Sequence, residues 1–185
     1  MFAETPNLVI RDLELGDLPA LLNISSDPDV VTAMDAYLPP DMAGLQHWLV
    51  ETIGHNQQQP RTSHNCAIVL KANGNVIGWI GFGTPSHPAM ADSSFGYALN
   101  SAYRNQGYMT EATKAILTYC FDMLEAQTVS ASHKRFNTAS GRVMQKAGMR
   151  LNATKEPAVA NDDEVHYIIT ADEWRAFQNQ LDASF

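Results

Sequence analysis

A hairpin signal at residues 73–74 constrains the fold of this chain more than any other feature of its sequence. Two apolar runs, "NCAIVLK" and "VIGWIGFG", flank the tetrapeptide "ANGN". Asn73-Gly74 suits a tight turn in which both central residues take a positive φ. The two runs are therefore predicted to be neighbouring antiparallel strands, and any fold proposed for the chain has to contain that pair.

Around this hairpin the apolar periodicity predicts a fixed order of strands and helices. Further strands are expected at residues 8–13, 93–100, 128–133, 150–155 and 164–170. Helices are expected after the caps Asp17 and Asp41, over about 109–125 and 138–148, and from the capping box Thr170-x-x-Glu173. Antiparallel strands followed by strand-helix-strand-helix predict an α/β fold, a mixed central sheet of about six to seven strands with helices on both faces. The 185 residues suit a single domain spanning 1–185.

The composition excludes several classes of protein. No apolar run approaches the roughly 18 residues of a membrane span, and the N-terminus lacks the pattern of a signal peptide, so we expect a cytoplasmic protein without membrane contact. A net charge of −8 argues against a nucleic-acid partner. Cys66 and Cys120 are predicted to be reduced core residues, and the six histidines show no metal-ligand spacing, so each is expected at the surface or a sheet edge and no metal is expected.

The charges are unevenly distributed along the chain. Residues 1–60 contain nine acidic residues, and Arg11 is their sole Lys or Arg. Residues 126–155 contain six Lys and Arg residues and no Asp or Glu. Such polarity is suited to a polyanionic ligand on one side and a cationic one on the other. Solvated surface faces are the alternative explanation.

The segment "AYRNQGYMTEA", residues 102–112, joins a predicted strand to a predicted helix. A strand ending near Asn100 and a helix starting near Met109 leave backbone N–H groups unpaired at the positive end of a helix dipole. Gly107 would let an anion approach this backbone, and Arg104 could add a bidentate cation. The alternative is a plain helix N-terminus with a surface arginine.

A second junction of the same kind follows in "HKRFNTASGRVMQKAGMR". Asn137 occupies the N-cap position of a helix and Ser140 lies in its first turn, which capping alone would explain. Two successive junctions, the second within the densest run of positive charge, favour a ligand that carries several phosphates.

These residues carry a family resemblance. "FGYALNSAYRNQGYMTEA" followed by "NTASGRVMQKAGM" resembles the acetyl-CoA core of GNAT-type N-acetyltransferases, most closely the ribosomal-protein N-terminal acetyltransferases and their relatives. The family's phosphate motif places Arg104, Gly107 and Met109 in its three defined positions, and Met109 departs from the usual Gly or Ala, which leaves open whether its bulk shifts the pyrophosphate. Asn137 and Ser140 match the branch's Asn-x-x-Ser motif.

The resemblance implies direct attack of an amine on the thioester in a ternary complex. Backbone N–H groups near Ala98 and Leu99 would hold the oxyanion, and Ser140 would protonate or orient the sulfur, with Tyr97, Tyr103 and Tyr108 as competitors for that role. Glu156 is the favoured base, ahead of Asp162, Asp163 and Glu164. The acceptor wall would include Met34, Tyr37 and Trp48. The residues implied in acetyl-CoA binding are Tyr97, Ala98, Leu99, Arg104, Asn105, Gln106, Gly107, Tyr108, Met109, Thr110, Asn137, Ser140, Arg142 and Lys146.

The resulting hypothesis is an acetyl-CoA-dependent N-acetyltransferase, active as a monomer or homodimer. Its acceptor would be a cationic amine, first of all the N-terminal α-amine of a ribosomal or other protein or of a basic peptide, attracted by the acidic first sixty residues. A small-molecule amine of the polyamine or aminoglycoside type is the competing acceptor. A non-catalytic acyl-CoA-binding regulatory module is the alternative from a different class.

Overall fold

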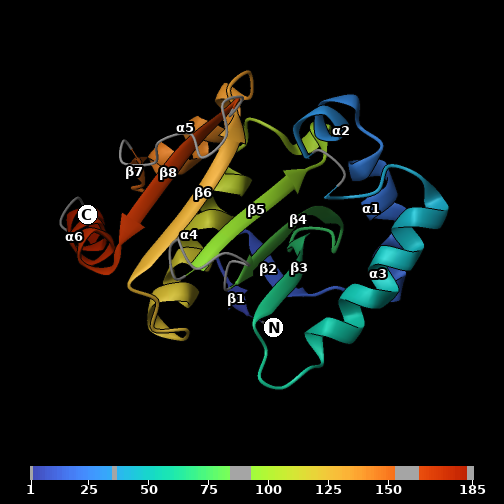
Figure 1. Ribbon diagram of the computed structural model, residues 1–185, viewed down its shortest axis with the longest axis horizontal. Coiled ribbons are helices and arrows are strands. Elements are labelled where there is room, and N and C mark those ends of the chain that lie inside the picture. The colour runs from blue at the N-terminus through green and yellow to red at the C-terminus, as the bar shows by residue number, and fades with distance from the viewer. Residues whose placement is uncertain (1, 35–36, 84–92, 153–162, 183–185) are drawn as a thin grey trace.

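A single mixed sheet runs through the protein (Figure 1). The computed structural model describes residues 2–34, 37–83, 93–152 and 163–182. Within them the sheet has eight strands in the order β1-β2-β3-β4-β5-β6-β8-β7, all antiparallel to their neighbours except the parallel pair β5 and β6. The strands are β1 (Ala3–Glu4), β2 (Leu8–Asp12), β3 (Ser63–Leu70), β4 (Val76–Gly83), β5 (Ser93–Leu99), β6 (Thr128–Lys134), β7 (Arg150–Leu151) and β8 (Glu164–Thr170). The mixed α/β sheet expected from the sequence is confirmed, with the short β1 as an addition.

Helices cover both faces of the sheet. They are α1 (Leu18–Ser25), α2 (Pro28–Met34), α3 (Met42–Asn56), α4 (Tyr108–Asp122), α5 (Thr138–Lys146) and α6 (Ala171–Asp182). Leu21 and Leu45 pack with Trp79 in a hydrophobic core under α1 to α3. Ile116 and Met144 belong to a second, larger core under α4 and α5. The two cores lie on opposite faces of the sheet, because Cys66 and Ile68 of β3 belong to one core and Ala67 between them belongs to the other.

The hairpin between β3 and β4 forms as expected, but with a longer turn. Its loop spans residues 71–75, and Leu70 both donates to the carbonyl of Asn75 and accepts from the N–H of Gly74, each at 2.8 Å. Gly74 has a φ of 73°, whereas Asn73 keeps an ordinary negative φ. The expected two-residue turn is therefore wrong, because one left-handed residue is enough to close this larger loop.

Strands β5 and β6 separate soon after they begin. Their pairing is limited to Ser93 with Val129 and Ser94 with Ser130, and beyond it the two strands diverge toward their carboxyl ends (Figure 1). Helix α4 follows β5 and helix α5 follows β6, so both helices begin beside this opening. The opening is where the fold places a cavity.

Helix starts were predicted well where the cap is local. Asp41 accepts from the N–H of Gly44, and Thr170 and Glu173 form the reciprocal capping box. Asp17 instead accepts two hydrogen bonds from Arg11, at 2.7 and 2.8 Å, and one from the N–H of Glu14. The Asp17 side chain therefore fixes a turn and an ion pair rather than capping α1.

Both cysteines are buried free thiols, as predicted. Within the described ranges no three or more His, Cys, Asp and Glu side chains gather in a way that could hold a metal ion. None of the helices in those ranges has the length and apolarity needed to cross a membrane.

His64 contradicts the expectation of surface histidines, because it is only 4% exposed. Its ring stacks on Phe82 with centroids 4.7 Å apart, and the rings of Phe2 and Tyr119 meet it edge-on. Its pKa is lowered from 6.5 to about 4, first because burial disfavours the charged ring and then because the Arg61 cation lies nearby. The aromatic cluster therefore holds a neutral imidazole.

We expect this histidine to make stability depend on pH. Between pH 6.5 and about 4 the unfolded chain binds a proton at His64 that the folded chain does not, so stability falls as the pH falls through this window. The expected loss is about 2 kcal/mol between pH 7 and pH 5. Urea denaturation at both pH values measures it, with His64→Phe, which keeps an aromatic ring in the stack, as the comparison. Equal losses in the two proteins would contradict the prediction.

Candidate functional site

A cavity of about 630 Å³ lies between the diverging ends of β5 and β6. Its walls come from α2, the carboxyl half of β5, the loop into α4, the end of β6 and the first turns of α5. Both strand-to-helix junctions singled out in the sequence therefore open into one cavity, as expected. Its size falls in the usual range for sites that bind small molecules and cofactors.

The loop into α4 presents its backbone to this cavity. Asn105 and Gly107 both have left-handed φ values, 61° and 86°, and both line the cavity. The first N–H groups of α4 have no partner within the helix, because its first intrahelical bond runs from Glu111 to the carbonyl of Gly107. Met109 is 5% exposed and belongs to the hydrophobic core. Met109 also lines the cavity, so its side chain both packs on the core and borders the space into which the loop opens.

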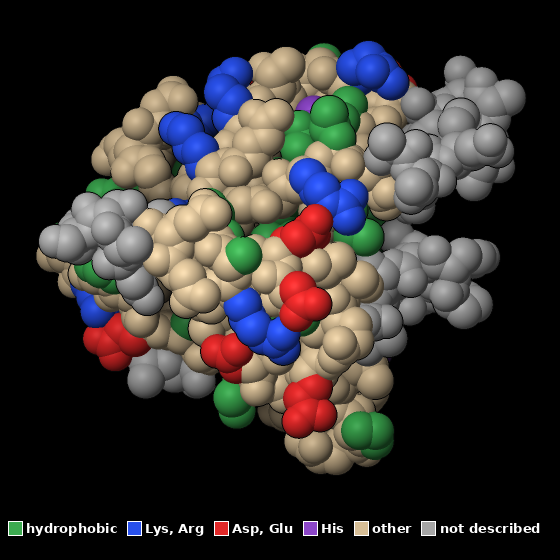
Figure 2. All heavy atoms as spheres, turned by 90° about the vertical axis from the view of Figure 1, so that its left-hand side faces the viewer, with side chains coloured by type: hydrophobic (Ala, Val, Ile, Leu, Met, Phe, Trp, Pro, Cys, Tyr) green, Lys and Arg blue, Asp and Glu red, His purple; other side chains and the backbone are tan. Residues whose placement is uncertain are grey.

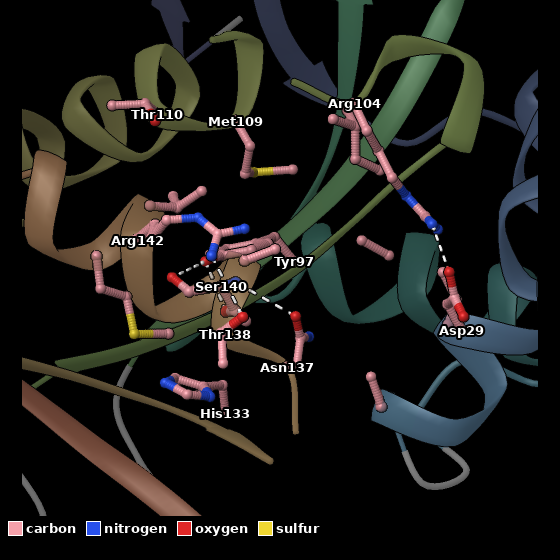
Figure 3. A pocket seen from close by; sticks show the side chains of 18 of the residues that line it. Asp29, Tyr97, Arg104, Met109, Thr110, His133, Asn137, Thr138, Ser140 and Arg142 are labelled. Carbon is pink, nitrogen blue, oxygen red and sulfur yellow. Dashed lines mark hydrogen bonds and ion pairs between the residues drawn. The ribbon is translucent and has the colours of Figure 1, made fainter. Parts of the chain in front are cut away.

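Arg104, predicted to add a cation, lines the cavity, but its side chain is paired with two aspartates. Its guanidinium donates to Asp29 at 2.8 Å and to Asp27 at 3.0 Å, and Figure 3 shows it directed away from Ser140 toward Asp29. Gln106 is not one of the cavity-lining residues, since its amide bonds back to the carbonyl of Ala102 at 3.1 Å. These two side chains shape the loop, and what the loop offers an anion is backbone N–H.

The start of α5 brings Ser140 against Tyr97. The side chain of Asn137 accepts from the N–H of Ser140 at 3.3 Å, which confirms its capping role. The hydroxyl oxygens of Tyr97 and Ser140 lie 2.8 Å apart, and the Tyr97 hydroxyl also donates to the carbonyl of Ser140 at 3.2 Å (Figure 3). Burial raises the pKa of Tyr97 despite its hydrogen bond with the Ser140 hydroxyl, so the Tyr97 hydroxyl stays protonated. The pair can therefore present a hydroxyl proton to the cavity.

The exposed edge of β5 supplies backbone donors. The N–H of Asn100 donates to Ile77 of the neighbouring strand at 2.9 Å. Because amide directions alternate along a strand, the N–H of Ala98 also points to β4, while those of Tyr97 and Leu99 point into the gap beside β6. Leu99 is therefore placed as expected for an oxyanion donor, and the N–H of Ala98 is not.

The remaining cofactor-binding candidates gather around the same cavity. Tyr108, Thr110, Arg142 and Lys146 all line it. Arg142 and Lys146 lie on α5, and neither has an ion pair with any residue that the structure describes. They are the positive charges that remain available to an anionic ligand.

Of the three candidates for the acceptor wall, one lines the cavity and two do not. Met34 lines the cavity from α2, whereas Tyr37 and Trp48 are not among its lining residues. Tyr37 is 74% exposed, and Trp48 packs edge-on against Trp79 with ring centroids 6.1 Å apart. Trp48 is therefore a packing residue, because its neighbours belong to the core under α3.

Of the four carboxylates considered as the base, Glu156 and Asp162 lie outside the described residues. Asp163 is paired with Arg135 at 3.7 Å. Glu164 accepts from the hydroxyl of Ser132 at 2.7 Å, and Ser132 lines the cavity. Glu164 is thus the described candidate that reaches the cavity wall through a hydrogen bond.

Sequence reasoning missed several lining residues, among them Val30, Ala33, His133 and Phe136. His133, expected at the surface or a sheet edge, is half-buried at the end of β6; its Nδ1 lies 2.8 Å from the carbonyl of Lys134 and its ring packs against Tyr167. The position of His133 at the end of β6, just before the Asn137 junction, could have identified it as a lining residue. No sequence feature identified Val30 and Ala33, because their helix was not predicted.

Comparison with known proteins agrees with this geometry. The family model described as an acetyltransferase (GNAT) domain matches residues 7–150. This chain belongs to the GNAT acetyltransferase family. An N-acetyltransferase of Bacillus subtilis named YnaD, itself uncharacterized, is 27% identical over 180 residues, which cover 94% of this chain and 99% of that protein.

Solved structures show the same GNAT fold. A GNAT-family acetyltransferase from Bacillus anthracis has a TM-score of 0.77 at 25% identity, over 93% of this chain and 99% of that one. An aminoglycoside acetyltransferase solved in complex with coenzyme A has a TM-score of 0.71 at 15% identity, over 92% of this chain and 99% of that one, a likeness of fold alone. The protein is thus an acetyl-CoA-dependent acetyltransferase, as predicted, and the family does not specify its acceptor.

The residues present fit acetyl-CoA, which supplies a thioester as the acetyl donor. The loop at 104–107 offers backbone N–H groups for a diphosphate, and Arg142 and Lys146 offer charge. The N–H of Leu99 is available where negative charge develops on a carbonyl oxygen. The Tyr97 and Ser140 hydroxyls are available as proton donors on the α5 side.

Proposed function

We propose that this chain acetylates a primary amine, most favourably the N-terminal α-amine of a protein or basic peptide. The amine attacks acetyl-CoA directly in a ternary complex. The contact between Tyr97 and Ser140 beside the unpaired edge of β5 carries the proposal, since it joins a proton donor to a backbone oxyanion donor in one cavity. We place the protein, on its Asn137-x-x-Ser140 motif, near the ribosomal-protein N-terminal acetyltransferases, and we treat residues 1–185 as one domain.

The acids of the cavity support an acceptor that brings one charged amine into the cavity over an acceptor that brings several. Asp29 is the single carboxylate among the described residues that line the cavity, and it is already paired with Arg104. Polyamines and aminoglycosides carry several positive charges, which a site for them would have to match with free carboxylates. An α-amine carries one charge and loses it on deprotonation.

Several carboxylates of the first sixty residues are neutralised by ion pairs with nearby Lys and Arg side chains. Glu4 pairs with Lys71, Asp12 with Arg61, and Asp17 with Arg11. Figure 2 shows the other side of the molecule, the side of α6 and β7 in Figure 1, where Asp and Glu side chains also lie beside Lys or Arg. Long-range attraction is therefore a smaller part of acceptor recognition than the net charge of −8 suggests.

The chemistry of the amine points the same way. An α-amine has a pKa of about 7.7–8.0 and a lysine side chain one of about 10.4, so at neutral pH a far larger share of the α-amine is already nucleophilic. The described carboxylates around this site are all hydrogen-bonded or paired. Such a site suits an α-amine, because an α-amine needs less help from a general base to lose its proton.

The test uses a short basic peptide with a free N-terminus, the same peptide N-terminally blocked, and spermidine. With acetyl-CoA we expect thiol release and an acetylated product from the free peptide, and neither from the other two. The rate should rise with pH and level off near about 8, where an α-amine has lost its proton. Comparable acetylation of the blocked peptide or of spermidine would contradict the α-amine proposal. Binding of acetyl-CoA without thiol release from any amine would instead indicate a non-catalytic acyl-CoA-binding module.

A further inference from the structure

Arg104 joins two parts of the protein that are far apart in sequence. It lies in the loop that leads into α4, and its partners Asp27 and Asp29 flank the start of α2. The two contacts are 2.8 Å to Asp29 and 3.0 Å to Asp27, and the Arg104 side chain is 32% exposed. Charge-assisted pairs of this length hold a planar guanidinium in a fixed orientation.

The aspartates are themselves ordered. One oxygen of Asp27 accepts from the N–H of Asp29 at 2.9 Å, while the other accepts from Arg104. The Asp27 side chain is only 14% exposed, whereas that of Asp29 is 81% exposed. One cation between two carboxylates leaves this cluster with a net negative charge, which makes it a poor site for a phosphate.

Helix α2 contributes little to the hydrophobic core among the described residues. Val30 is its one buried residue, and the helix is only seven residues long. Yet Val30, Ala33 and Met34 line the cavity on the wall opposite α5. The position of this wall therefore depends strongly on what holds the start of α2.

We infer that Arg104 is a positioning residue, which couples nucleotide binding at the loop 104–107 to the placement of α2 through its ion pairs with Asp27 and Asp29. The inference rests on the proposed function and deepens it. When coenzyme A fixes the loop, the guanidinium fixes the start of α2, and the acceptor wall becomes ordered. Donor binding thereby prepares the site for the acceptor, which is a coupling between two ligands through one shared element.

The experiment measures amide hydrogen exchange of the peptide that contains residues 27–34, with the full chain and with coenzyme A as the probe. In the unmodified protein we expect coenzyme A to slow exchange in this peptide about fivefold or more. Asp27→Asn with Asp29→Asn should abolish that slowing, because asparagine at 27 keeps an acceptor for the N–H of residue 29 but removes both ion pairs. Calorimetric affinity for coenzyme A should stay within about threefold of the original value.

A matched control removes the same charge elsewhere. Glu14→Gln with Glu51→Gln, both on exposed side chains away from Arg104, should leave the slowing intact. With the peptide acceptor, the Asp27→Asn and Asp29→Asn variant should raise KM for the peptide about fivefold or more with little change in kcat, a split that a general loss of folding would not give.

Two results would overturn the inference. One is undiminished slowing of exchange in the variant with both asparagines. The other is a tenfold or greater loss of coenzyme A affinity in Arg104→Ala, which would make Arg104 a phosphate ligand after all. If coenzyme A produced no calorimetric binding signal in the unmodified protein, the proposed function itself would be wrong. If coenzyme A bound but one of the two results above were found, only the inference about Arg104 would be wrong.

Discussion

Ser140→Ala is expected to lower kcat about a hundredfold while the affinity for acetyl-CoA changes by less than about threefold. The Ser140 side chain is buried, and its hydroxyl lies 2.8 Å from that of Tyr97. Alanine would remove the hydroxyl proposed to protonate or orient the departing sulfur, but would leave the Tyr97 hydroxyl a partner in the carbonyl of residue 140, at 3.2 Å. The loss should therefore appear in turnover and not in binding, as measured by steady-state kinetics and calorimetry.

Two further variants separate chemistry from packing. Tyr97→Phe keeps the ring against Phe95 and removes the hydroxyl, and we expect about a tenfold loss of kcat. Combined with Ser140→Ala it should cost less than the product of the two losses, because residues that act as a unit are not additive. Ser25→Ala removes a buried hydroxyl from α1, outside the cavity, and should leave kcat unchanged. An unchanged rate in Ser140→Ala would assign the proton to another donor.

The sequence predicted the donor half of the site well because its signals are local. A glycine shortly before a helix and an asparagine cap three residues before a serine both act within one turn of backbone. The structure places both junctions at the same cavity, with φ 86° at Gly107 and the Asn137 cap formed. Strand order then brings the junctions together, because β5 and β6 are parallel neighbours.

What the sequence could not predict depends on contacts between distant residues. The partners of Arg104 are 75 and 77 residues away, so its spacing from Gly107 suggested a phosphate contact and gave no sign of these ion pairs. Trp48 lies on an amphipathic helix, but whether that helix borders the cavity depends on how α3 packs on the sheet, and no residue of α3 lines the cavity. Helix α2 has one buried residue and hence almost no apolar period to detect.

The turn between β3 and β4 was also not fully predictable from the local sequence. Asn73-Gly74 correctly indicated antiparallel pairing, but the length of the turn follows from the register of β3 and β4, which shifts between Ile68 and Val69. That irregularity moves the closing bond to Leu70 and Asn75. Register is set by packing on both faces of the sheet, so a dipeptide alone does not fix it.

Gly107→Ala is expected to weaken acetyl-CoA binding about tenfold. Its φ of 86° costs an alanine about 1–2 kcal/mol, and an added Cβ would meet nothing within 4 Å, so the effect is one of backbone conformation and not of collision. In the free protein the exposed loop relaxes to avoid this cost, and the N–H groups turn away from the cavity. Binding then has to restore the left-handed conformation, which removes the same free energy from the affinity. Calorimetry with acetyl-CoA measures the change.

Gly74 provides the matched comparison, because it has a φ of 73° and also has nothing within 4 Å of an added Cβ, but lies in the β3–β4 loop and does not line the cavity. Gly74→Ala should carry the same conformational cost and leave acetyl-CoA affinity unchanged. Gly107→Asn should restore most of the affinity, because asparagine tolerates the left-handed region, as Asn105 does at 61° in the same loop. If Gly107→Ala bound acetyl-CoA as tightly as Gly74→Ala, the backbone of this loop would not be the diphosphate site.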